Sequence, residues 1–138
     1  MVEQIFEFIG NHYFLVGVFV VLLVAFVINE GKQGGAAIGP SNLVNLVNKE
    51  GAVILDIRDG KEYGVGHIAG AINIPLSSFD SRVSELDAYK EKPVVLVCKM
   101  GQHAGTIGRK LKANGFEHVR RLSGGMAEWT GSNLPVVK

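Results

Sequence analysis

One cysteine in the chain lies where it could act as a nucleophile. Cys98 directly follows an apolar run over residues 93–97, and after it come the short loop KMGQH and a helical pattern. Successive backbone N–H groups in a tight loop, backed by a helix N-terminus, form a concavity that favours anions. A thiol held there has its thiolate stabilised, and the thiolate is the reactive form. Cys98 is therefore the candidate catalytic residue, and an inert cysteine ending a buried strand is the alternative.

The loop after Cys98 supplies the candidate substrate-binding residues, and the first of them adds a cation beside the thiol. These residues are Lys99, Met100, Gly101, Gln102 and His103. Cys98 is the only cysteine, so the chain cannot form an internal disulfide and fits a reducing compartment. The four histidines are scattered without metal-ligand spacing, and we expect neither a metal nor another cofactor.

The elements that position this loop alternate along the chain. Helical patterns cover residues 40–49, 77–89 and 104–114, and a short helix through Trp129 follows Gly124 and Gly125. Short apolar runs typical of strands cover 53–55, 71–74, 93–97 and 119–122. Strands alternating with helices favour an α/β fold with a parallel sheet flanked by helices. The continuous apolar run at 93–97 predicts a central strand covered on both faces. Ligands bind beyond the carboxyl ends of such strands, which is where Cys98 lies.

A charged pair follows the first predicted strand. Asp56 and Arg58 lie two residues apart at the end of that strand. They are candidate supporting residues, because a charged pair at this edge could brace the neighbouring loop of Cys98. A network that stabilises the fold without taking part in the chemistry is the alternative.

Two longer motifs surround the cysteine loop. The segment LDIRDGKEYGVGHIAGAINIP (55–75) resembles the first signature of the rhodanese family, and RLSGGMAEWTGSNLPV (121–136) resembles its C-terminal signature. The likeness covers about residue 40 to the C-terminus. It implies a rhodanese-like fold with a five-stranded parallel sheet, in which Cys98 carries sulfane sulfur as a persulfide.

The cysteine loop departs from the family at one position. Active members commonly read Cys-x-x-Gly-x-Arg, whereas this chain keeps Gly101 and has His103 in place of the arginine. Arginine offers a planar and permanently charged fork for an oxyanion such as thiosulfate, which histidine does not reproduce at neutral pH. Transfer of sulfur from a persulfide donor depends less on that fork.

Two functions remain in competition. The first is a sulfurtransferase in which Cys98 takes sulfur from a sulfane-sulfur donor, such as thiosulfate or a persulfide, and passes it to a thiol acceptor. The second is a catalytically weak or inactive docking module that binds a protein partner at the membrane. A cysteine phosphatase requires arginine six residues after the cysteine, where this chain has Ala104. The net charge of +1 and the lack of a basic stripe argue against nucleic acid as a partner.

The N-terminal segment predicts a membrane anchor. Residues 13–28 carry no charge, and extending back to Ile5 gives roughly 24 residues, enough to cross about 30 Å of hydrocarbon. A cleaved signal peptide normally begins with basic residues, but here the N-terminal residues carry Glu3 and Glu7 and no lysine or arginine. A buried core helix does not fit, because the rest of the chain is too small to enclose it.

Charge bias predicts the orientation of this anchor. Lys32 and Lys49 follow the apolar stretch and no basic side chain precedes it, which places the C-terminal domain in the cytoplasm. We therefore expect a single-pass protein of the inner (cytoplasmic) membrane that contacts the lipid bilayer. Its predicted parts are an anchor over residues 1–29, a glycine-rich linker over 30–39 and a rhodanese-like domain over 40–138.

Overall fold

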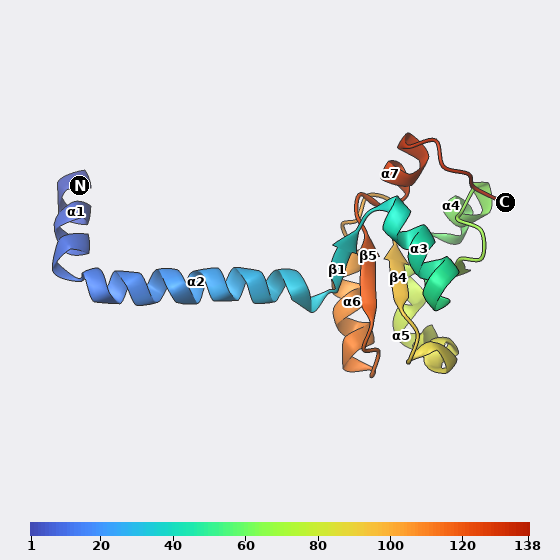
Figure 1. The fold of residues 1–138 in the computed structure, drawn as a ribbon, viewed down its shortest axis with the longest axis horizontal. Coiled ribbons are helices and arrows are strands. Elements are labelled where there is room, and N and C mark those ends of the chain that lie inside the picture. Colours follow the sequence, from blue (N-terminus) through green and yellow to red (C-terminus); the bar gives the residue numbers. More distant parts are fainter. The chain divides into compact units, whose positions relative to one another are not determined.

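A computed structural model describes residues 1–29 and 34–138. The chain divides into two compact units, Met1–Lys32 and Gln33–Lys138. The first unit contains two helices, α1 (Val2–Asn11) and α2 (Tyr13–Gln33). The second unit is an α/β domain in which five strands alternate with helices (Figure 1).

The domain is built on one parallel sheet with the strand order β1-β5-β4-β2-β3. The strands are β1 (Ala36–Ile38), β2 (Val53–Asp56), β3 (Ile72–Asn73), β4 (Val94–Val97) and β5 (Val119–Leu122). The helices outside residues 76–89 are α3 (Pro40–Glu50), α4 (Gly60–Val65), α6 (Ala104–Ala113) and α7 (Gly125–Gly131). The predicted α/β fold with a five-stranded parallel sheet flanked by helices is confirmed.

The central strand β4 separates two hydrophobic clusters. Val94 and Leu96 belong to the cluster that contains α6, and Val95 and Val97 belong to the cluster that contains α3 and α7. All four side chains are fully buried, because alternate residues of a strand point to opposite faces and helices cover both. The prediction of a central strand covered on both faces is thereby confirmed.

The segment predicted as one helix over residues 77–89 consists of three short pieces. They are η1 (Leu76–Ser78), α5 (Phe79–Arg82) and η2 (Val83–Tyr89). Val83, Leu86 and Tyr89 pack against the core at a spacing of three residues. A 3₁₀ helix has three residues per turn, so it aligns these side chains on one side.

The N-terminal boundary of the domain differs from the sequence prediction. Residues 36–38, which were assigned to the linker, form the edge strand β1, and Arg121 donates from Nε to the carbonyl oxygen of Gly35 (2.7 Å). Three small residues, Gly34 to Ala36, suited a linker by composition, whereas pairing with β5 some 85 residues later places β1 in the sheet. Residues 30–33 of the predicted linker lie outside the described residues.

The N-terminal unit is not one continuous helix. The chain turns at His12 (φ −128°, ψ 35°), and α1 is bent by 96° relative to residues 13–29 of α2. Gly10, Asn11 and His12 are weak helix formers, which accounts for the break. Within the described residues, neither helix alone is long and apolar enough to cross a bilayer, and only the bent pair together meets that criterion.

Candidate active site

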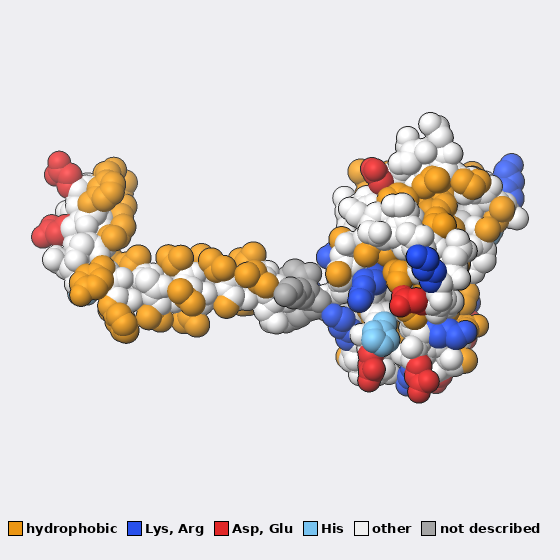
Figure 2. All heavy atoms as spheres, in the orientation of Figure 1, with side chains coloured by type: hydrophobic (Ala, Val, Ile, Leu, Met, Phe, Trp, Pro, Cys, Tyr) orange, Lys and Arg blue, Asp and Glu red, His pale blue; other side chains and the backbone are white. Residues whose placement is uncertain are grey.

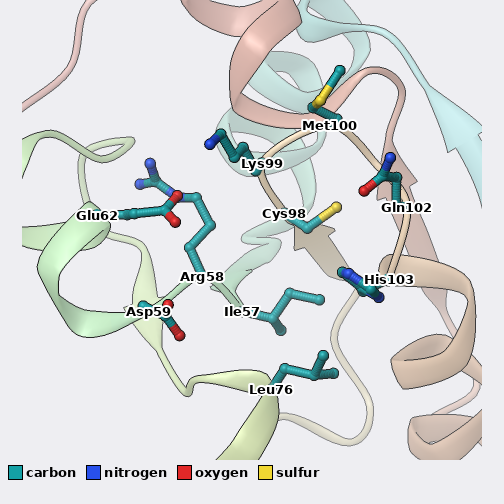
Figure 3. A pocket seen from close by; sticks show the side chains of 10 residues that line it. All are labelled: Ile57, Arg58, Asp59, Glu62, Leu76, Cys98, Lys99, Met100, Gln102 and His103. Atoms are coloured by element: carbon teal, nitrogen blue, oxygen red, sulfur yellow. The ribbon is translucent and has the colours of Figure 1, made fainter.

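Cys98 lies at the carboxyl end of β4, on the floor of a cavity of about 260 Å³ (Figure 3). Only 4% of the residue is exposed. The predicted residues Lys99, Met100, Gln102 and His103 line the same cavity. Because the residue is almost completely buried, a reacting group would have to enter the cavity to reach the thiol.

The backbone of the cysteine loop is oriented by α7. Met126 donates its N–H to the carbonyl oxygen of Cys98 (2.8 Å), and Ala127 donates to that of Lys99 (2.9 Å). In a trans peptide the C=O and N–H groups point in opposite directions. The N–H groups of Lys99 and Met100 therefore point away from α7, which contributes no residue to the cavity lining.

Three glycines permit this close approach of α7 to the loop. Gly101, Gly124 and Gly125 all have positive φ angles, of 85°, 71° and 58°. A Cβ atom on Gly125 would overlap the carbonyl oxygen of Cys98. The role of Gly124 and Gly125 in holding the cysteine loop emerges only in the fold.

The far end of the loop is fixed by α6. His103 is the N-cap residue of this helix, and its carbonyl oxygen accepts the N–H of Ile107 (3.4 Å). Ala104, Ile107 and Leu111 are fully buried and hold the helix against the sheet. The side chain of His103 remains exposed and lies at the rim of the cavity near Cys98 (Figure 3).

Asp56 and Arg58 form a buried ion pair. The guanidinium donates to both carboxylate oxygens (2.8–3.1 Å), and Nη2 also donates to the carbonyl oxygen of Gly66 (2.8 Å). The Asn73 amide donates to the carbonyl oxygens of both residues (3.0 and 2.9 Å). The pair thus ties the segment between β2 and β3 together, and these hydrogen bonds join residues of that segment rather than the loop of Cys98.

Four further residues line the cavity and were not predicted: Ile57, Asp59, Glu62 and Leu76. They lie on the segments that follow β2 and β3. Ile57 donates its N–H to the carbonyl oxygen of Val97 (2.9 Å), which extends the β2–β4 pairing to the edge of the site. Because carboxyl ends of neighbouring parallel strands meet at one edge, the strand order would have identified this group.

The cavity carries charges of both signs. Lys99 lies beside Cys98, and Asp59 and Glu62 lie across the cavity from the loop (Figure 3). The predicted supporting residue Arg58 also lines the cavity, and its charge is paired with Asp56. A dianionic ligand would therefore meet Lys99 and the paired guanidinium of Arg58, but also two carboxylates.

Comparison with known proteins places the chain in a family. Residues 39–132 match the family of rhodanese-like domains. The chain belongs to that family. It is 35% identical to YibN of Escherichia coli K12 over 140 residues, which covers 99% of this chain and 98% of YibN. It is 32% identical to the thiosulfate sulfurtransferase GlpE of Actinobacillus pleuropneumoniae over 99 residues, covering 72% of this chain and 90% of GlpE.

Solved structures show the same relationship. The rhodanese-like domain of an Anabaena protein superimposes with a TM-score of 0.64 at 28% identity, covering 73% of this chain and 77% of that domain. The CoADR-RHD protein of Bacillus anthracis gives 0.65 at 27% identity, covering 75% of this chain and 18% of that protein. Rhodanese and sulfurtransferase are thus supported for this chain at the level of the family.

Proposed function

We propose that the protein is a membrane-anchored sulfurtransferase that moves sulfane sulfur through a persulfide on Cys98. The observation that carries this proposal is the position of the thiol on the floor of the cavity, in a loop whose carbonyl groups are held by α7. Because the N–H groups of Lys99 and Met100 point away from α7, they are available to stabilise a thiolate or a persulfide anion.

The reaction takes place in two displacements. The Cys98 thiolate attacks the outer sulfur of a donor persulfide, so that a bond forms between Sγ and that sulfur and the donor leaves as a thiolate. An acceptor thiolate then attacks the outer sulfur of the Cys98 persulfide, and the Cys98 thiolate is restored. Each step exchanges one S–S bond for another, so no external oxidant or reductant is required.

The charges of the cavity favour a persulfide over thiosulfate as the donor. Thiosulfate is a dianion and would face Asp59 and Glu62, without the permanent charge that an arginine at position 103 would supply. A persulfide carries at most one negative charge, and it is attacked at its outer sulfur in the protonated form. GlpE is a thiosulfate sulfurtransferase by name, and this chain is proposed to differ from it in the preferred donor.

The proposed anchor is residues 1–29. Neither of its helices alone reaches the usual length of a membrane span, and we propose that the bilayer is crossed by residues 13–29. They are uncharged, their apolar side chains are mostly exposed, and at 1.5 Å per residue they extend about 26 Å, close to the hydrocarbon thickness of about 30 Å. The orientation with the domain in the cytoplasm rests on the basic residues that follow this stretch. The domain would then meet reduced thiol donors and acceptors at the inner membrane.

A docking module that binds a protein partner at the membrane is the second candidate. The observation that favours it is the exposed imidazole of His103 at the position where the family pattern has arginine. In that case the cavity would receive a side chain of the partner, and Cys98 would carry no sulfur.

Intact mass spectrometry of the full-length protein separates the two candidates. After treatment with a small-molecule persulfide and removal of excess reagent, wild type should gain the mass of one sulfur atom, and a thiol acceptor should remove it. Cys98→Ser is the matched control and should gain none. Wild-type protein that stays unmodified while correctly folded would favour the docking module.

Extraction of membranes with alkaline carbonate tests the anchor separately. The full-length protein should remain in the pellet with its N-terminus intact. Release into the supernatant would contradict the anchor and leave the sulfur chemistry untouched.

A further inference from the structure

Helix α1 is strongly amphipathic. With 3.6 residues per turn, its five apolar side chains fall within an arc of about 160°, and the remaining positions occupy the opposite side. The apolar arc consists of Val2, Ile5, Phe6, Phe8 and Ile9, which are 41–69% exposed. No side chain of α1 is buried. The helix therefore presents a complete apolar face that nothing in the described structure covers.

The turn between α1 and α2 is a defined feature rather than a frayed end. The N–H of His12 donates to the carbonyl oxygen of Phe8 (3.0 Å) and ends α1, and its carbonyl oxygen accepts the N–H of Val16 (3.0 Å) and begins α2. The rings of Phe8 and His12 also contact each other, with centroids 4.7 Å apart. At this residue the two helices are bent by 96°.

The direction of the apolar face is consistent with this bend. In Figure 2 the hydrophobic side chains of α1 gather on the side toward which α2 runs, and the acidic side chains lie on the opposite side. A helix perpendicular to α2 with its apolar face turned this way would lie flat on the surface of a bilayer that α2 enters. Its acidic side chains would then face water.

We propose that α1 is an interfacial helix that lies flat in the headgroup region of the bilayer crossed by α2, on the side opposite the rhodanese-like domain. This inference rests on the proposed anchor. Tyr13 at the bend places an amphipathic ring at the same level, as is common at membrane interfaces. The uncharged part of α2 is slightly shorter than the hydrocarbon thickness, and a flat α1 fixes how deeply α2 sits.

Burial of apolar side chains, not attraction to anionic lipid, holds α1 in place. The helix carries Glu3 and Glu7 and no lysine or arginine. Interfacial helices that depend on anionic lipids carry basic residues on their polar face. We therefore expect α1 to occupy neutral phosphatidylcholine bilayers and to be insensitive to salt.

A fluorescent probe on each face of α1 tests this arrangement in the full-length chain. Cys98→Ser provides a background without cysteine, and Phe6→Cys and Gln4→Cys introduce single labelling sites on the apolar and polar faces. Each variant is labelled with nitrobenzoxadiazole and reconstituted into phosphatidylcholine vesicles. We expect the probe at position 6 to emit several-fold more strongly than the probe at position 4. It should be quenched more by nitroxides near the headgroup than by nitroxides near the acyl-chain ends.

The other outcomes overturn the inference in distinguishable ways. Bright, deeply quenched probes at both positions would mean that α1 enters the hydrocarbon as part of the span. Dim probes at both positions would place α1 in water. A bright probe at position 6 that lipid nitroxides do not quench would indicate contact with a second copy of the chain. Loss of the position 6 signal at high salt would also contradict the inference.

Carbonate extraction of the same labelled variants separates this inference from the proposed anchor. Retention of the chain in membranes with a dim probe at position 6 overturns only the interfacial helix. Release of the chain from membranes overturns the anchor as well.

Discussion

The loops that follow β2 and β4 lie at the same edge of the sheet but use their polar groups differently. After β2, Asp56 and Arg58 bond to each other, to Gly66 and to Asn73. After β4, the carbonyl groups of Cys98 and Lys99 are held by α7, while the side chains of the loop line the cavity. The side chains of the first loop form hydrogen bonds within the fold, whereas those of the second loop line a cavity. Motifs of similar prominence in sequence therefore have different surroundings in the structure.

Replacement of the thiol should have the largest effect on function. Cys98→Ser is expected to abolish sulfur transfer completely, since no other cysteine is present to carry the sulfur. The loss of stability should be smaller than that caused by Asp56→Ala. Transfer assays and urea denaturation of the same preparation measure the two effects, and residual transfer by Cys98→Ser would contradict the assignment.

Removal of one partner of the buried ion pair should have the largest effect on stability. Asp56→Ala leaves Arg58, which is 9% exposed, without its counter-charge, and we expect the free energy of unfolding to fall by about 3–5 kcal/mol. Glu85→Ala is the matched control, because it breaks the exposed pair with Arg82. Equal urea midpoints for the two variants would show that the ion pair in the loop after β2 does not stabilise the fold more than an exposed pair does.

The contact between α7 and the cysteine loop can be disturbed without changing any side chain of the cavity. Gly125→Ala places a Cβ against the carbonyl oxygen of Cys98 at a positive φ, so the loop must shift. We expect sulfur loading to fall at least about tenfold and stability to fall by about 1–3 kcal/mol, as for other overpacked sites.

Gly131→Ala in the same helix is the control for this effect, since nothing lies within 4 Å of its added Cβ. It should leave sulfur loading unchanged. Normal loading by Gly125→Ala would show that the orientation of the loop carbonyls is not required.

Restoring the arginine of the family pattern should raise the rate of sulfur transfer from thiosulfate. His103→Arg adds a permanent forked donor at the rim of the cavity, and a charge-assisted hydrogen bond contributes about 1.5–3 kcal/mol. Thiosulfate:cyanide transfer should therefore rise about ten- to a hundredfold in kcat/KM. Cys98→Ser in the same background should remove the gain. Activity that stays at background in the folded variant would favour the docking module.

Loss of the exposed ion pair between Arg82 and Glu85 should have the smallest effect on stability. The hydrogen bond from Arg82 lowers the pKa of Glu85, so the pair contributes stability above the ordinary pKa of a glutamate and loses it as pH falls through the lowered value. Glu85→Gln should hardly change the urea midpoint at neutral pH. The remaining difference from wild type should vanish in acid, and a large difference at neutral pH would contradict this account.

The sequence by itself was enough to establish the core of the domain and the position of the thiol. The run at 93–97 has no polar residue, and such a run must be covered on both faces, which fixes it as a central strand with Cys98 at its carboxyl end. The alternation of strands and helices fixed the parallel sheet in the same way. These features follow from local patterns, because the order of apolar and polar side chains along the chain determines which faces of an element can be buried.

Only the tertiary structure decided which partners the polar groups find. The bonds from Met126 and Ala127 to the cysteine loop, and the pairing of β1 with β5, join residues far apart in the chain. The sequence left open whether Asp56 and Arg58 brace the cysteine loop or stabilise the fold. In the structure the two side chains pair with each other. Hydrogen bonds are directional and depend on where backbones meet in space, so residue order gives the donors and acceptors but not the pairs they form.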